Sequence, residues 1–372
     1  MSRTLTIFID GLPFDQLEKL PYSSRFVSKG RLVPILGYSV NCQTQLFTGK
    51  KPDELGFWGE WTYAPETAPF KKLAPLFKLL SLVEVSYYAK RVVHRFIDKM
   101  GRASATKNIP LSYLGKFEET GHSVLSSWFK QESLLQHPKL KVILHNKFPV
   151  VERRDEDAYK ATKKYIDETD DLQSVLVTFT RIDACSHWLG VASDPYNELL
   201  LVQDKYIEEL SEAYLAKVPD GTILVASDHG MVNVTEQVNI NFEREIGNPN
   251  ANGYAYFTEG TILRVWCERD AMREKIATYL DGVAGIEELC DEDRKEFGIT
   301  NPKFGDLIYH THEGHQFVPS FWGPKPSVGM HGYHPRYESQ HGICLSSRPG
   351  DFDGKVSATD FYNVLSGYLG TA

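Results

Sequence analysis

Short apolar runs alternate with longer amphipathic segments along most of the chain. Residues 3–9, 174–180 and 222–226 are apolar runs of strand length, which are typical of strands buried on both faces of a sheet. Residues 155–169 and 194–217 have the length and the polar spacing of helices. Strands that alternate with helices predict a three-layer α/β fold, in which a mostly parallel central sheet is flanked by helices.

Weaker patterns add elements around this core. The further core elements that we predict are strands at 31–36 and 342–346 and helices at 40–48 and 358–368. Gly49 fits as the C-terminal cap of the first of these helices. Residues 261–267, 270–280 and 285–289 predict a small strand–helix–strand insert.

The segment from residue 51 to residue 150 differs from the rest, because aromatic and basic residues crowd it. We therefore predict a catalytic α/β core at 1–50 and 151–372, which contains a small α+β insert at about 255–320. Residues 51–150 are predicted to form an inserted cap.

Within this predicted cap, residues 71–107 hold nine basic and two acidic residues and form a basic island on an acidic protein. Three interpretations of the island stay open. It binds the non-reacting part of an anionic substrate, it makes a peripheral contact with an anionic membrane surface, or it is an ordinary cap helix whose charges face water.

Composition narrows the class of protein. The chain has 372 residues, of which 42% are hydrophobic, and its net charge of −8 excludes a protein that coats nucleic acid. No run of 18 apolar residues occurs, so we predict no membrane-spanning helix, and the N-terminal residues predict no signal peptide. The five cysteines are odd in number and form no CxxC pair, which predicts reduced thiols and a cytoplasmic location. The oligomeric state is left open.

Residues of the types that bind metals follow three of the predicted strands, and one more lies in a glycine-flanked loop. They are Asp10, Asp183, His187, Asp228, His229 and His331. In open parallel sheets, ligand sites form beyond the carboxyl ends of the strands, so we expect these side chains to converge at one edge. Six such ligands can hold two divalent cations; carboxylate oxygen with imidazole nitrogen suits Zn²⁺, with Mn²⁺ as the second choice.

A cation pair of this kind stabilises the attacking and the leaving oxygen of a displacement at phosphorus, and it activates a hydroxyl as nucleophile. Ser39 is our candidate, because it lies between a predicted strand and a predicted helix, where the helix N-terminal amides favour phosphate oxygens. Asn41 is a candidate donor to a phosphoryl oxygen, and Thr44 is a second candidate nucleophile.

These motifs, in this order, resemble the alkaline phosphatase superfamily and, within it, the type I phosphodiesterase/nucleotide pyrophosphatase branch. The segments that carry the resemblance are IFIDG at 7–11, SVNCQTQLFTG at 39–49, DACSH at 183–187, ASDHGM at 226–231 and GMHGY at 329–333. The family's nucleophile lies nine residues before the threonine of a Thr-Gly pair, which here is Thr48-Gly49, so the resemblance implies Ser39. An alignment on Ser-Val instead would place Asn41 in that position.

The resemblance also implies a partition of the ligands. One cation would be bound by Asp183, His187 and His331, and the other by the nucleophile with Asp10, Asp228 and His229. The family's proline and glycine around its Asp-x-x-x-His pair are absent here, although the ligand residues remain.

We therefore expect a metal-dependent phosphodiesterase, similar to a nucleotide pyrophosphatase, that works through a covalent phosphoryl-serine. Its expected substrate is small and phosphorylated: a nucleotide, a nucleotide-sugar or a lipid head group. The alternatives are a phosphomonoesterase, a phosphotransferase or mutase of the same superfamily, and a non-catalytic binding protein on this fold.

Overall fold

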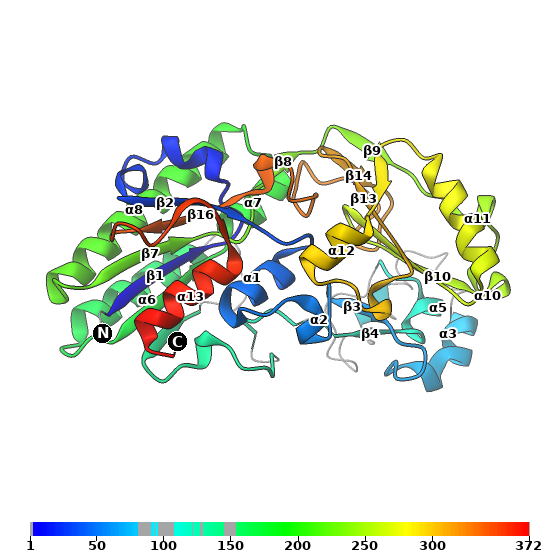
Figure 1. Cartoon of the computed structure of the whole chain (residues 1–372), viewed down its shortest axis with the longest axis horizontal. Helices are drawn as coiled ribbons and strands as arrows, with labels where there is room; N and C mark the ends of the chain where they lie inside the picture. The colour runs from blue at the N-terminus through cyan, green and yellow to red at the C-terminus, as the bar shows by residue number, and fades with distance from the viewer. Residues whose placement is uncertain are drawn as a thin grey trace. The chain divides into compact units, whose positions relative to one another are not determined.

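The computed structural model describes residues 3–80, 91–92, 94–95, 108–120, 122–126, 129–144 and 154–371. The chain divides into two compact units, and each contains several separate segments of sequence (Figure 1). Unit 1 comprises Met1–Lys50, Ser123–Val234 and Ser327–Ala372, whereas unit 2 comprises Lys51–His122 and Thr235–Pro326. Among the described residues, no helix has both the length and the apolar character needed to span a bilayer.

Unit 1 is built on a seven-stranded sheet with the order β17-β2-β16-β7-β1-β6-β5. Its strands are β1 (Thr4–Ile9), β2 (Ser28–Val33), β5 (Leu140–Ile143), β6 (Ser174–Phe179), β7 (Thr222–Ala226), β16 (Gly342–Ser346) and β17 (Asp353–Ser357). Strand β1 lies between β6 and β7 and is parallel to both, with Leu5 opposite Val175 and Ile223. Only β16 runs antiparallel to its two neighbours, so the sheet is mostly parallel, as predicted.

Helices cover both faces of this sheet (Figure 1). They are α1 (Ser39–Thr48), α6 (Arg154–Glu168), α7 (Arg181–Leu189), α8 (Asp194–Lys217) and α13 (Ala358–Leu369). Alternate residues of β1, such as Ile7, pack with α6 and α8 in one core. On the other face, Phe8 packs on Phe47 of α1, which in turn packs on Phe361 of α13. The three-layer α/β fold is confirmed.

Local signals in the sequence set where several of these helices begin and end. Helix α1 ends at Gly49, whose left-handed φ of 70° is costly for any residue with a side chain. The Ser193 side chain accepts a hydrogen bond from the Tyr196 amide at the start of α8. At the start of α13, Ser357 and Asp360 form a capping box.

Unit 2 contains a four-stranded antiparallel sheet with the order β10-β11-β13-β12. Its strands are β10 (Tyr254–Thr258), β11 (Ile262–Cys267), β12 (Ile286–Glu288) and β13 (Leu307–Thr311). Helix α11 (Asp270–Asp281) covers one face, where Ile276 and Leu280 pack with Leu263 and Tyr309.

The other face of that sheet packs on an aromatic cluster, which includes Trp61, Phe117, Phe257 and Trp266. Trp61 and Phe117 belong to a two-stranded antiparallel sheet formed by β3 (Trp61–Tyr63) and β4 (Phe117–Glu119). Described aromatic residues of the predicted cap, such as Trp61 and Phe117, are therefore core residues of unit 2.

The smaller elements complete the description. In unit 1 they are β8 (Val232–Asn233), β15 (Gly329–Met330) and the 3-10 helices η1 (Phe14–Lys19), η2 (Ser23–Arg25), η5 (Leu134–Gln136) and η8 (Glu338–Gln340). In unit 2 they are α2 (Pro52–Leu55), η3 (Lys71–Leu73), α3 (Ala74–Leu80), α5 (Leu111–Leu114), β9 (Glu236–Val238), α9 (Phe242–Glu245), α10 (Pro249–Asn252), α12 (Asp291–Phe297), η7 (Pro302–Phe304) and β14 (His315–Phe317).

The two units differ from the predicted domains in two places. The segment from Ser123 belongs to unit 1, because β5 pairs with β6 as the edge strand of the large sheet. The small insert, predicted within the core at about 255–320, belongs instead to the same unit as residues 51–122. Most of the basic island at 71–107 lies outside the described residues, so its three interpretations stay open.

Candidate metal centre and active site

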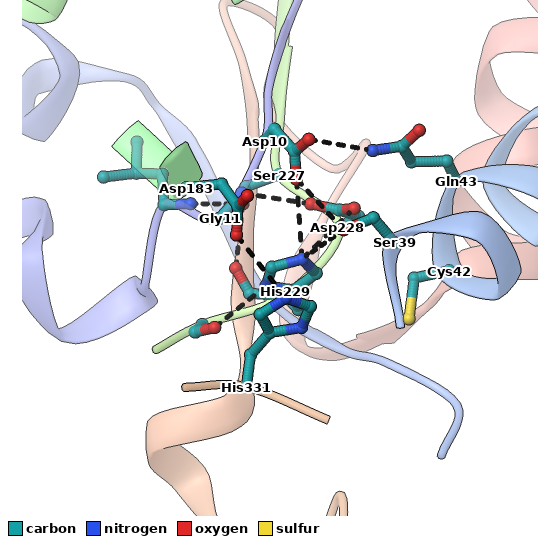
Figure 2. A network of polar contacts seen from close by, with 12 residues as sticks. Asp10, Gly11, Ser39, Cys42, Gln43, Asp183, Ser227, Asp228, His229 and His331 are labelled. Carbon is teal, nitrogen blue, oxygen red and sulfur yellow. Dashed lines mark hydrogen bonds and ion pairs between the residues drawn. The ribbon is translucent and has the colours of Figure 1, made fainter. Parts of the chain in front are cut away.

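Three neighbouring strands of unit 1 deliver acidic and histidine side chains to one edge of the sheet (Figure 2). Asp10 follows the last residue of β1, while Asp228 and His229 follow β7. Strand β6 leads into α7, which carries Asp183 and His187 one helical turn apart. The predicted convergence at the carboxyl ends of the parallel strands is thus present in the structure.

Backbone contacts fix the loop that follows β1. The Asp10 amide donates to the Phe179 carbonyl at 2.8 Å, and the Asp183 amide donates to the Asp10 carbonyl at 3.2 Å. The Gly11 amide donates to Asp228 Oδ1 at 3.2 Å. Gly11 has a φ of 71°, and a Cβ at this position would lie 2.8 Å from the Asp183 Cβ. Only glycine therefore allows the three strand ends to approach this closely.

Hydrogen bonds orient two of the imidazole rings toward the carboxylates. His187 Nδ1 lies 2.9 Å from the Gly329 carbonyl, and His229 Nδ1 lies 2.9 Å from the Gly230 carbonyl. Because a carbonyl only accepts, each Nδ1 carries the proton and each Nε2 is left as a ligand atom. Hydrogen bonding of the second ring nitrogen in this way is usual for histidines that bind metals.

The Nε2 atoms face the carboxylates at short distances. His187 Nε2 and His331 Nε2 lie 3.4 Å and 3.5 Å from Asp183 Oδ1. His229 Nε2 lies 3.5 Å from Asp10 Oδ1 and 3.6 Å from Asp228 Oδ2. The His229 and His331 rings stack at 3.7 Å, so the two halves of the cluster are contiguous. All six predicted ligands are brought together.

Burial makes this concentration of negative charge costly. Loss of hydration and the nearby charge of Asp10 raise the pKa of Asp228 to about 8, and burial with the charge of Asp183 also raises the pKa of Asp10. Burial opposes the charged form of His229, but Asp228 and Asp10 outweigh it and raise its pKa to about 10. The cluster therefore attracts positive charge.

The donor set fits divalent cations. Ligand atoms of Asp183, His229 and His331 lie within 4.8 Å of one another, and so do those of Asp10, Asp228 and His229. Among the described residues, Asp183 Oδ1 and Asp228 Oδ2 are buried without a hydrogen-bond donor. Carboxylate oxygens of this kind, beside imidazole Nε2 atoms, are the ligands that Zn²⁺ and related cations prefer.

The candidate nucleophiles differ in their surroundings. Ser39 Oγ, at the first residue of α1, donates to Asp10 Oδ1 at 3.4 Å and lies 3.0 Å from His229 Nε2. The Thr44 hydroxyl donates to the Val40 carbonyl of its own helix. Asn41 is buried in the first turn of α1, and its predicted role stays a prediction. Of the candidate nucleophiles, Ser39 is thus the one whose hydroxyl lies beside the predicted metal ligands.

Sequence reasoning missed one residue of this site. Gln43 Nε2 donates to Asp10 Oδ2 at 3.1 Å (Figure 2). Gln43 Oε1 accepts from Ser123 Oγ at 3.4 Å. Gln43 thereby fixes the orientation of the Asp10 carboxylate. Its place four residues after Ser39, on the same face of a helix, is the signal that would have identified it.

A family model provides the classification that this geometry suggests. The model of type I phosphodiesterases/nucleotide pyrophosphatases matches residues 4–334, which include all six ligands and Ser39. The chain belongs to this family, within the alkaline phosphatase superfamily, and is therefore a hydrolase of phosphoric esters. No curated protein matches the sequence of this chain.

Solved structures agree with this fold. Murine ectonucleotide pyrophosphatase/phosphodiesterase 5 is 15% identical and matches with a TM-score of 0.67 over 100% of this chain and 96% of that chain. An inactive threonine-to-alanine variant of the murine protein, in complex with AMP, gives the same values. The human protein of the same name is 14% identical, with a TM-score of 0.68 and the same coverage. The predicted resemblance and the predicted fold are both confirmed.

Proposed function

We propose that this protein is a metal-dependent phosphodiesterase of the nucleotide pyrophosphatase type, with Ser39 as its nucleophile. One observation carries the proposal: the Ser39 hydroxyl lies within hydrogen-bond reach of Asp10 and His229, inside a buried cluster in which histidines are the only ion-pair partners among the described residues. A hydroxyl in such a place is suited to attack phosphorus once its proton is lost.

The residues divide the work as follows. Asp183 would hold one cation together with His187 and His331, which both face its Oδ1. Asp10, Asp228, His229 and Ser39 would hold the other. Bound there, two divalent cations would supply positive charge to the attacking oxygen and to the phosphoryl oxygens. Zn²⁺ suits these ligands best, and Mn²⁺ is the second choice.

The reaction then takes two displacements at phosphorus. In the first, a bond forms between Ser39 Oγ and phosphorus as the bond to the leaving-group oxygen breaks, and the leaving group departs with the proton that Ser39 loses. In the second, a water oxygen attacks the phosphoryl-serine, the bond to Oγ breaks, and the serine hydroxyl is restored. Asp10, held by Gln43, keeps its carboxylate beside Oγ throughout.

We propose a nucleotide or nucleotide-sugar as the substrate, with a lipid head group as the alternative. The murine relative, whose threonine-to-alanine variant is inactive and holds AMP, supports a nucleotide and a hydroxyl nucleophile.

The free state of all five cysteines supports the proposed cytoplasmic location.

Turnover of two chromogenic esters tests the proposal. We expect bis-p-nitrophenyl phosphate, a diester, to be hydrolysed faster than p-nitrophenyl phosphate, a monoester, in the presence of Zn²⁺ or Mn²⁺. A strong preference for the monoester would identify a phosphomonoesterase. Products formed on added alcohols would identify a phosphotransferase, and no turnover of either ester would favour a binding protein.

A further inference from the structure

Helix α7 carries two of the six ligands, yet the residue that precedes it does not cap it. The helix spans only Arg181–Leu189, and Asp183 is its third residue. Thr180 occupies the capping position, but its side chain accepts no hydrogen bond from the helix. The amides at the start of α7 therefore need an acceptor from elsewhere in the chain.

Asp155, in the first turn of α6, supplies that acceptor. Its Oδ1 accepts from the Thr180 amide at 2.9 Å, and its Oδ2 accepts from the Arg181 amide at 3.1 Å. Gln203 of α8 donates to Oδ2 at 2.6 Å. The Asp155 side chain is 2% exposed, so three helices meet at one buried carboxylate.

A carboxylate at this place fixes both the position and the direction of α7. Its charge complements the positive end of the helix dipole, and its two oxygens set two successive amides. Burial raises the pKa of Asp155 to about 6, although the backbone hydrogen bonds from Thr180 and Arg181 oppose the shift. At pH 8 the side chain is therefore ionised and able to accept all three hydrogen bonds.

Asp183 lies two residues beyond Arg181, about 3 Å further along the helix axis. It is otherwise tied to the strand end by its amide, which donates to the Asp10 carbonyl at 3.2 Å. His187 is tied at the far end of α7 by its contact with the Gly329 carbonyl at 2.9 Å. A movement of the start of α7 would displace Asp183 relative to His331. These two residues would then no longer be placed to bind the same cation.

We propose that Asp155 is a positioning residue for the metal centre: by capping α7 from a different helix, it holds Asp183 and His187 in place for one of the two cations. The inference rests on the proposed function, because it assumes that Asp183 and His187 bind a cation. It differs from a purely structural role, because it predicts an effect on one cation rather than on the fold alone.

The test is a Zn²⁺ titration of the metal-stripped full chain at pH 8, in competition with a fluorescent chelator. Asp155→Asn keeps the size of the side chain but replaces one acceptor with a donor that faces a backbone amide. Asp157→Asn, an exposed position on the same helix, is the matched control. Hydrogen exchange of the peptide at 180–189 is the second readout.

We expect Asp157→Asn to bind two Zn²⁺ with the same two dissociation constants as wild type. In Asp155→Asn, the dissociation constant for one Zn²⁺ should rise about 10- to 100-fold while the other is unchanged. The peptide at 180–189 should exchange its amide hydrogens faster. If Asp155→Asn does not fold, Gln203→Met removes a single donor to the carboxylate, and we expect a several-fold change in the same direction.

Two results would overturn the inference, and they are distinguishable. Asp155→Asn (or Gln203→Met in its place) that binds both Zn²⁺ as tightly as wild type would leave Asp155 with a structural role only. A wild-type chain that binds no Zn²⁺ would instead overturn the proposed metal centre and, with it, this inference.

Discussion

Buried carboxylates occur in both units, but their charge is balanced in different ways. In unit 2, Glu259 is 3% exposed and lies 3.5 Å from Arg264, which is fully buried. The Arg264 guanidinium also donates to the Trp58 carbonyl at 3.0 Å and lies over the ring of Phe257. This carboxylate has its cation within the chain, and the pair packs as part of a structural core.

Among the described residues, the carboxylates at the edge of the unit 1 sheet have no arginine or lysine partner. In the described part of the chain, the ion pairs of Asp10, Asp183 and Asp228 are all with histidines. A buried charge must be neutralised by a proton, a protein cation or a bound ion. The contrast separates a structural ion pair from a candidate site: Glu259 is paired with a cation of the chain, whereas the carboxylates and imidazoles of the unit 1 cluster could hold a bound cation.

Removal of divalent cations should have the largest effect. Dialysis against a strong chelator should abolish ester hydrolysis and lower the thermal unfolding midpoint, because bound cations neutralise the buried carboxylates. If the cations are present at about 1,000 times their dissociation constant, the loss of each one costs about 4 kcal/mol. Calorimetry and turnover measure the two effects, and added Zn²⁺ should restore both. If activity and the unfolding midpoint are unchanged after chelation, the unit 1 carboxylates need no bound cation and do not differ in this respect from Glu259.

Loss of the Ser39 hydroxyl should have the next largest effect. Ser39→Ala should lower kcat about 10³-fold or more, because the covalent step loses its nucleophile. Thr44→Val keeps the shape of its side chain and removes a hydroxyl that donates to the Val40 carbonyl of the same helix, so it is the matched control. Steady-state kinetics on a diester give the answer. A larger loss of kcat in Thr44→Val than in Ser39→Ala would identify Thr44 as the nucleophile instead.

Breaking the balanced pair of unit 2 should change stability rather than chemistry. Arg264→Met leaves Glu259 buried without its cation and should destabilise the protein by about 3–5 kcal/mol. Adding Glu259→Leu should recover much of this loss, since an apolar pair needs no compensation. Denaturant unfolding measures the stability of both variants, and their metal content is the control. A loss of bound cations in Arg264→Met would contradict it.

Loss of the hydrogen bond that orients Asp10 should have the smallest effect. Gln43→Leu removes the donor to Asp10 Oδ2 and should weaken cation binding or turnover about 10- to 100-fold. Chelator competition measures the affinity. Gln45→Leu, at a position on the same helix, is the control. Equal affinity in the two variants would show that Gln43 does not orient Asp10.

Some of the fold was predictable because pattern and length agreed. The strand at 222–226 and the helix at 194–217 have the predicted bounds, since each combines a clear period with clear end signals. The strand predicted at 31–36 instead spans Ser28–Val33, because Pro34 has no amide to continue the ladder. The insert predicted as strand–helix–strand has four strands, since the places of β10 and β13 are set by pairing in the tertiary structure.

The site was more predictable than the division into units. Ligands such as Asp10 and Asp228 could be located because a parallel sheet gathers its strand ends at one edge. Asp155 could not be located, because it acts through contacts between elements distant in sequence. Gln43 had only a local signal, its place four residues after Ser39 on the same helix. The assignment of β5 to the large sheet depends on pairing with β6, which its four residues do not reveal alone.

We propose that the edge of the unit 1 sheet binds two cations, and elemental analysis of the purified protein counts them. After equilibration with Zn²⁺ and removal of excess ions, we expect two divalent cations per chain in wild type. We expect no more than one in Asp228→Asn, which loses a buried ligand without changing its shape. A wild-type chain without divalent cations, or the same content in both proteins, would contradict the account.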